Sequence, residues 1–287
     1  MGEKREISRK TFLKSMLAAT AAATVLPKLS FADSAFFNAK DLIVWSCGGL
    51  AETFTEVNAL YEKKRGVTIN YTGAFAGALG KSLLGGNATT EVFAGRVLKL
   101  AQSLRQTGKI IYFKPLCFTE YVIVTPADNP AGIQSIDDLA KPGVRVILPL
   151  GASPPGGDAV ANIIKKAGID KDVRSNMIEK ESCVIKMMPK VVKRICEASI
   201  VERRLTTMPA YEGKVHIIPI DESLFPPGPL TFTVGVMKAA SDRTLADDYV
   251  NFLCDKEAQA AFQRHGFIPA DSPKGRELIK KLGVKDG

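Results

Sequence analysis

Short runs of consecutive apolar residues alternate along the chain with segments in which apolar residues recur at the spacing of a helix. The strand-like runs lie at residues 41–46, 67–71, 91–94, 121–125, 144–148, 198–201 and 230–237. The helical segments lie at residues 50–61, 79–84, 97–105, 136–139, 160–167, 189–196 and 245–265. This alternation predicts α/β units arranged around a mainly parallel sheet.

Three of these units share a strand, a tight turn rich in small residues and the start of a helix. The turns contain Gly48-Gly49, Ala76-Gly77 and Gly156-Gly157. Each such turn directs free backbone N–H groups and the positive end of a helix dipole outward, and glycine lets a ligand approach the backbone closely. A single glycine at such a turn is ordinary turn chemistry. Three turns at corresponding positions favour a cradle for an anion.

Residues 1–32 have the pattern of a secretory signal. Basic residues precede an apolar run at 16–25, and a small-residue cleavage site follows at 30–32. The run 8–14 resembles a twin-arginine motif whose second arginine is Lys10, so the Sec and Tat routes both stay open. Because no later stretch approaches the roughly 18 apolar residues of a membrane span, we expect a periplasmic protein that is not inserted in the membrane after signal removal.

The charge of the chain does not indicate a polyanionic partner. The full sequence has 39 basic and 30 acidic residues, a net charge of +9. The predicted signal holds six of the basic and two of the acidic residues, which leaves +5 on the mature chain. Its Lys and Arg residues are scattered among acidic neighbours rather than clustered with aromatic residues, so nucleic-acid binding is disfavoured. The length suits one large or two modest domains with a substantial core, and we expect a monomer.

The cysteines and histidines offer few candidate ligands. The five cysteines form no CxxC pair, and their odd number leaves at least one thiol unpaired within a monomer. Cys117, Cys196 and Cys254 adjoin apolar runs and are interpreted as packing residues. His216 and His265 lack spaced partners of the metal-binding type and are interpreted as structural.

An ordered series of short motifs extends over roughly residues 40–270. The motifs are Leu42-Ile43-Val44-Trp45, Ala76-Gly77-Ala78-Leu79, Glu91-Val92-Phe93-Ala94, Asp137-Asp138-Leu139, Pro155-Gly156-Gly157, Ala258-Gln259-Ala260 and His265-Gly266-Phe267. This series resembles the periplasmic molybdate-binding proteins of ABC importers. The resemblance implies two α/β lobes joined by a hinge that is crossed twice, with a tetrahedral oxyanion held between them by N–H and hydroxyl donors.

The resemblance also implies a division of the chain and a set of site residues. We expect lobe 1 to comprise residues 40–119 and 229–271, lobe 2 to comprise 120–228, and 272–287 to form a C-terminal tail. The predicted ligand-binding residues are Cys47, Gly48, Gly49, Phe75, Ala76, Gly77, Gly156, Cys183, Val184 and Glu202. The chain would then be the substrate-binding component of an ABC importer, working with a permease and using neither a cofactor nor catalytic residues.

The sequence departs from the family at positions that should face the ligand. Gly49 and Ala76 stand where the family has hydroxyls, and Glu202 stands where it has a binding tyrosine. Lost donors and a nearby carboxylate both oppose an anion. We interpret the pair Arg203-Arg204 as a solvated face, with Arg203 able to reach the cleft mouth and counter the charge of Glu202.

A second interpretation makes the same site a soft-metal or metalloid site, in a transporter component or a periplasmic sensor. Cys47 at a helix start should have a lowered pKa. With Cys183 and Glu202, and with Met187 as a further candidate, it would bind a thiophilic ion. Alternatively, Cys47 and Cys183 are buried apolar residues or form a disulfide. A thiol-dependent enzyme is disfavoured, because the sequence shows no base paired with Cys47 and no HExxH, Walker or Gly-x-Ser-x-Gly motif.

Overall fold

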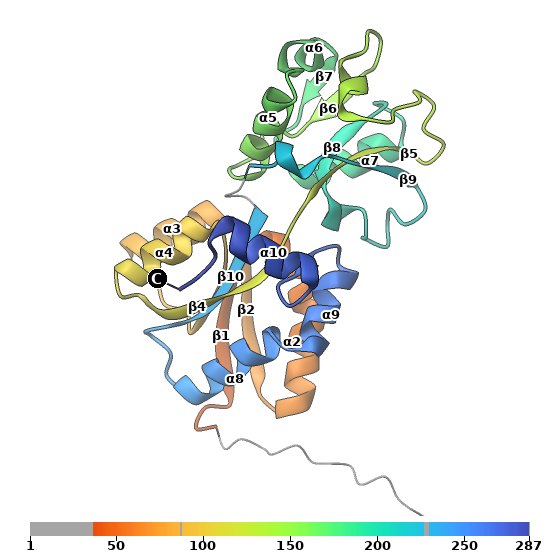
Figure 1. Cartoon of the computed structure of the whole chain (residues 1–287). Helices are drawn as coiled ribbons and strands as arrows, with labels where there is room; N and C mark the ends of the chain where they lie inside the picture. Colours follow the sequence, from red (N-terminus) through yellow and green to blue (C-terminus); the bar gives the residue numbers. More distant parts are fainter. Residues whose placement is uncertain (1–36, 87, 227–229, 287) are drawn as a thin grey trace, which may run out of the picture. The chain divides into compact units, whose positions relative to one another are not determined.

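One six-stranded sheet and two smaller sheets carry the fold (Figure 1). This computed structural model describes residues 37–86, 88–226 and 230–286, so the predicted signal segment lies outside the described residues. The strands are β1 Asp41–Cys47, β2 Thr68–Ala74, β3 Val92–Arg96, β4 Ile110–Phe118, β5 Tyr121–Pro126, β6 Val146–Leu148, β7 Met177–Lys180, β8 Ser199–Glu202, β9 Val215–Pro219, β10 Thr231–Met237 and β11 Ile268–Pro269.

The helices lie between these strands and after the last of them. The α-helices are α2 Ala51–Arg65, α3 Ala76–Gly85, α4 Leu98–Gln106, α5 Gly156–Lys166, α6 Asp170–Ser175, α7 Met187–Val192, α8 Arg243–Leu253, α9 Lys256–Arg264 and α10 Pro273–Leu282. Short 3-10 turns are η1 Gly48–Leu50, η2 Ile136–Ala140, η3 Val184–Lys186, η4 Arg203–Leu205 and η5 Glu222–Leu224. Among the described helices, none has the length and apolar character needed to cross a membrane.

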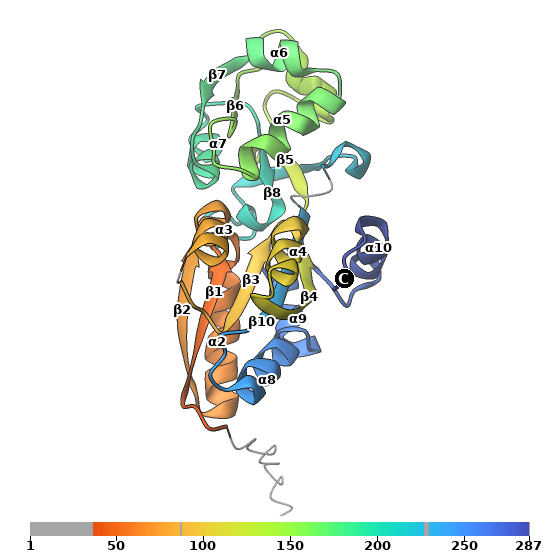
Figure 2. The same cartoon turned by 90° about the vertical axis from the view of Figure 1, so that its left-hand side faces the viewer.

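The six-stranded sheet has the order β11-β4-β10-β3-β1-β2 and, with its helices, forms what we call lobe 1. Successive residues of β3 point to opposite faces of the sheet. Val92 and Ala94 join the core shared with α2, α8 and α9, whereas Phe93 joins the core shared with α3 and α4. Figures 1 and 2 show these two groups of helices on either side of the sheet.

The strands β8-β5-β9 and β6-β7, with α5, α6 and α7, form lobe 2. Here β5 is the central element: Tyr121 and Ile123 pack into the core that includes α5 and α6, and Val122 and Val124 pack into the core that includes α7. The chain passes from lobe 1 to lobe 2 between β4 and β5, and returns between η5 and β10. The predicted two-lobed α/β class is therefore confirmed.

The six-stranded sheet is mixed and the sheet β8-β5-β9 is antiparallel, which corrects the prediction of mainly parallel sheets. Strands β2, β1 and β3 are parallel, but β10 is antiparallel to both β3 and β4, and β5 is antiparallel to β8 and β9. Parallel neighbours require a crossover through a helix, and the links β1-α2-β2 and β2-α3-β3 supply one. Strand β10 enters lobe 1 directly from the second crossing and runs in the opposite direction.

Several further elements differ from the sequence prediction, among them the last long helix and strand β4. The long helix predicted at 245–265 is divided into α8 and α9, because the side chain of Asp255 accepts a hydrogen bond from the backbone N–H of Ala258 and caps a new helix. Strand β4 was not predicted, and it contains Pro115 beside a shift in its register with β10. A proline removes one ladder hydrogen bond and is accommodated at such irregularities.

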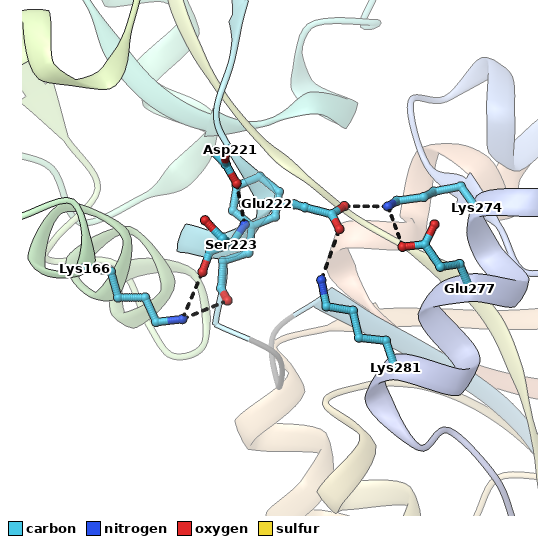
Figure 3. A network of polar contacts seen from close by, with 8 residues as sticks. Lys166, Asp221, Glu222, Ser223, Lys274, Glu277 and Lys281 are labelled. Carbon is cyan, nitrogen blue, oxygen red and sulfur yellow. Dashed lines mark hydrogen bonds and ion pairs between the residues drawn. The ribbon is translucent and has the colours of Figure 1, made fainter.

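The predicted C-terminal tail contains helix α10, which contacts both lobes. Its Leu278 packs with Phe118 at the end of β4 in lobe 1. Figure 3 shows Glu222 of η5, in lobe 2, accepting from Lys274 at 2.7 Å and from Lys281 at 3.0 Å. Helix α10 therefore connects lobe 1 to the turn that precedes the second crossing.

Substitution of two phenylalanines, one buried and one exposed, tests which residues form the core of lobe 1. Phe54 is fully buried and packs between the rings of Tyr71 and Phe262. We predict that Phe54→Ala lowers the free energy of unfolding by about 3–5 kcal/mol through the cavity that it leaves. Phe75→Ala is the matched control, because its side chain is 73% exposed and the expected change is within about 0.5 kcal/mol. Urea denaturation measures both, and equal losses would contradict this core assignment.

Candidate functional site

A pocket of about 490 Å³ is lined by residues of both lobes. Lobe 1 contributes residues 47–49 and 73–76 together with Arg96, and lobe 2 contributes 152–156 and 182–185 together with Glu202 and Arg204. The structure thus brings nine of the ten predicted site residues to one pocket. The exception is Gly77, which is exposed in the first turn of α3 and is not part of the lining.

The three small-residue turns lie at this pocket, although they differ in their free donors. The first turns of η1 and α3 have no side-chain cap, and their residues Gly48, Gly49 and Ala76 line the pocket. Gly156 differs from the prediction, because its N–H donates to the carbonyl of Ser153 at 3.2 Å. Gly157 has a packing role, since a Cβ there would lie 2.6 Å from the carbonyl oxygen of Ala152.

Glu202 is the centre of a buried cluster of charges at this pocket. Its Oε1 accepts from Nη1 of Arg96 at 2.6 Å, and its Oε2 accepts from Nε of Arg204 at 2.7 Å. Nη2 of Arg96 also donates to the hydroxyl of Tyr121 at 3.0 Å. Two guanidinium groups against one carboxylate give this cluster a net charge of +1.

The neighbouring charges keep Glu202 ionised. Burial by itself would raise the pKa of Glu202, but the positive charges of Arg96 and Arg204 lower this pKa to about 2. Burial would also lower the pKa of Arg96, yet Glu202 raises it above the ordinary value for arginine. The negative charge that was expected to repel an anion is therefore neutralised within the protein.

Arg204 is the residue whose role the sequence analysis assigned wrongly. Its side chain is only 7% exposed and belongs to the pocket, not to a solvated face. The neighbouring Arg203 pairs instead with Glu120 of lobe 2. A Cβ on Gly49 would lie 3.5 Å from Nε of Arg204, so the guanidinium lies against the turn in which the resemblance implied a hydroxyl. Arg204 thus places donors near the position where a hydroxyl is missing.

Arg96 was missed by sequence reasoning, because one arginine at a strand end has no distinctive spacing. A backbone feature marks the position in the structure: Val97 has φ 74°, which a β-branched residue rarely adopts. Its N–H is held by the carbonyl of Thr231 at 3.0 Å. Unusual backbone of this kind concentrates at functional sites.

The soft-metal interpretation is not supported by this geometry. The described part of the chain contains no group of three or more His, Cys, Asp or Glu side chains arranged to hold a metal ion. Both oxygens of Glu202 are occupied by arginines. Burial raises the pKa of the Cys47 thiol, despite the charge of Arg96, so the predicted thiolate is absent. Met187 lies in the lobe 2 core.

All five cysteines lie in described residues and are free, so Cys47 and Cys183 form no disulfide. Cys117 and Cys196 are buried, and Cys254 packs against the lobe 1 core, in agreement with their interpretation as packing residues. His265 pairs with Glu56 at 2.9 Å, and His216 is exposed in β9. Neither histidine lines the pocket described above.

A second pocket, of about 400 Å³, lies beside α10. Its Glu222 is paired with Lys274 and Lys281, and its Lys166 donates to the backbone carbonyls of Ser223 and Phe225. The charged groups of this pocket therefore already have hydrogen-bond or ion-pair partners within the protein. The pocket that contains Arg204 is therefore the stronger candidate for a ligand site.

Comparisons with known proteins agree with this architecture. A family model described as bacterial extracellular solute-binding protein matches residues 42–268. The molybdate-binding protein ModA of Mycobacterium bovis is 26% identical over 233 residues, which are 80% of this chain and 85% of that protein. These matches confirm the resemblance found in the sequence motifs.

Solved structures show the same fold at low sequence identity. The periplasmic molybdate-binding protein of Azotobacter vinelandii has a TM-score of 0.65 and 14% identity, with 79% of this chain and 98% of that chain covered. PEB3, a Campylobacter jejuni protein, solved with L-phospholactate bound, has a TM-score of 0.62 and 20% identity, with 79% and 99% covered. At these identities the likeness establishes the fold and leaves the ligand open.

The charge cluster gives a stability prediction. Glu202→Gln would leave two buried guanidinium groups without their counter-charge, so we predict that the free energy of unfolding falls by about 3–5 kcal/mol. The control is Glu257→Gln, whose carboxylate is 50% exposed and pairs with Lys64 on the surface. That change should stay within about 1 kcal/mol. Urea denaturation at pH 7 compares the two variants, and a similar small loss in both would contradict the role of Glu202.

The same pair predicts a dependence on pH. A glutamate in the unfolded chain has a pKa of about 4.3, whereas the pKa of Glu202 in the folded protein is about 2. The stabilisation is complete above about pH 5 and is lost as the pH falls towards 2. The stability difference between the wild type and Glu202→Gln should therefore be constant from pH 7 to 5 and shrink below about pH 4.5. A difference that already shrinks near pH 6 would contradict it.

Proposed function

Because the chain belongs to the bacterial extracellular solute-binding protein family, we propose that it is the substrate-binding component of an ABC importer and captures a small oxyanion between its lobes. The observation that carries the proposal is Arg204, a nearly buried guanidinium at the pocket where both lobes contribute residues. Backbone N–H groups of the turns at Gly48 and Ala76 add neutral donors. The chain binds its ligand and does not transform it.

The proposed mechanism is closure of the two lobes on the ligand. Residues 40–119 with 229–271 form one lobe, 120–228 form the other, and the two crossings act as the hinge. An anion that touches donors of both lobes makes more contacts in a closed state than in an open one, and it therefore favours closure. Removal of the signal at residues 1–32 releases the protein into the periplasm, where the closed form delivers the ligand to a permease.

Support for an oxyanion comes from two directions. The relatives from Mycobacterium and the structure from Azotobacter are named as molybdate-binding proteins. The charge of +1 at the pocket attracts anions of any shape, and arginine matches the geometry of paired oxygens. Both observations favour an oxyanion over the soft metal ion of the alternative interpretation.

Adjacent arginines provide the test. We predict that Arg204→Met weakens oxyanion binding about 10- to 100-fold, as expected for the loss of a hydrogen bond to a charged group. Arg203→Met is the matched control, because Arg203 pairs with Glu120 outside the pocket lining, and its affinity should be unchanged. Titration calorimetry with molybdate, tungstate, sulfate and phosphate measures both variants, after circular dichroism has shown that each is folded. Equal affinities of Arg204→Met and wild type would contradict the proposal.

A further inference from the structure

Apolar side chains surround the charged part of the pocket. Phe75, at the start of α3 in lobe 1, is 73% exposed, and Ile185, in η3 of lobe 2, is 46% exposed. Both belong to the pocket lining, together with Pro154 and Val184. Exposed apolar groups that adjoin a cavity and a few polar groups are typical of sites for organic ligands.

The guanidinium of Arg204 has N–H donors that are not used within the described part of the protein. Arg204 donates to Glu202 through Nε alone, and its two terminal nitrogens donate to no described residue. Its side chain is nevertheless more than nine-tenths buried and lines the pocket. Since buried donors are normally satisfied, these nitrogens are available for a ligand.

The balance of charge favours a monoanion. Arg96, Glu202 and Arg204 together carry +1, which one negative charge neutralises. A doubly charged inorganic oxyanion would leave an excess of negative charge in a confined site. Gly49 and Ala76 also lack the hydroxyls that would satisfy its remaining oxygens.

The size of the pocket also favours an organic ligand over an inorganic ion. A tetrahedral inorganic oxyanion fills roughly 100 Å³, since its four oxygens are comparable in size to water molecules of about 30 Å³ each. The pocket has about 490 Å³, within the range of sites for small organic molecules. In this conformation an inorganic ion would leave most of that volume to water, whereas a small organic molecule would occupy more of it.

We infer that the site is selective for a small organic monocarboxylate. The carboxylate accepts from the terminal nitrogens of Arg204, and the apolar body of the ligand lies between Phe75 and Ile185. This inference rests on the proposed function and narrows its ligand to one chemical class. Phe75 of lobe 1 and Ile185 of lobe 2, which we call the two lips of the pocket, would then bury apolar surface against the ligand when the lobes close.

The test compares probes that share a carboxylate but differ in their apolar body. Calorimetry with acetate, hexanoate and benzoate, and in parallel with molybdate and sulfate, gives affinities for the full mature chain. We expect hexanoate or benzoate to bind at least tenfold more tightly than acetate and both inorganic ions. Phe75→Ala and Ile185→Ala should each weaken that organic ligand about 5- to 30-fold and leave acetate unchanged. The control is Ile178→Ala, which removes a side chain that is 49% exposed in β7, outside the pocket lining.

Three results would overturn the inference. If molybdate or sulfate binds more tightly than every carboxylate and depends on Arg204, the ligand is inorganic, while the proposed function stands. If Phe75→Ala weakens molybdate and benzoate equally, the lips contact each other on closure and do not recognise the ligand. If no probe binds and the melting temperature shifts with none of them, the inference and the proposed oxyanion site fail together.

Discussion

Glu202 holds two guanidinium groups that come from different lobes. Arg96 is the last residue of strand β3 in lobe 1, and Arg204 belongs to the turn after the strand of lobe 2 that ends at Glu202 itself. Removing such charges from water is costly unless each has a partner at short distance. The cluster therefore requires the three side chains to remain together, and their shared position defines the charge of the pocket.

The pKa values of the two kinds of acid in the pocket are shifted in opposite directions. For Cys47, desolvation dominates and raises the pKa of the thiol, which stays neutral. For Glu202, desolvation acts in the same direction, but two adjacent cations outweigh it and lower the pKa. The thiol is thus a small packing group, while the carboxylate is a fixed counter-charge. This contrast explains why the pocket has the character of an anion site although it contains cysteines and a glutamate.

The hinge region carries a second set of contacts between the lobes. Helix α10 packs on the end of β4 through Leu278, and its Lys274 and Lys281 reach Glu222 on the other lobe (Figure 3). These ion pairs are partly exposed, so each contributes little to stability. The lobe closure that we propose would act on these pairs, because they join the turn η5 to helix α10.

The sequence by itself determined the α/β class, most of the strands and the three turns around the pocket. These features depend on periodicity and on glycine chemistry, which act over a few neighbouring residues. Nine of the ten predicted residues accordingly line one pocket. The sequence also indicated that Gly49, Ala76 and Glu202 depart from the family pattern, because a comparison of sequence motifs needs no coordinates.

Only the tertiary structure decided the charge of the site and the direction of strand β10 in the sheet. Arg96 and Glu202 are separated by 106 positions, and no local pattern records that they meet. Arg203 and Arg204 are adjacent and chemically identical, yet one pairs with Glu120 at the protein surface and the other is buried in the pocket. Strand β10 is antiparallel because of where the chain returns from lobe 2. In each case the deciding factor is a contact between segments that are distant in the sequence. Such contacts, and the burial and charge pairing that they bring, exist only in the folded chain.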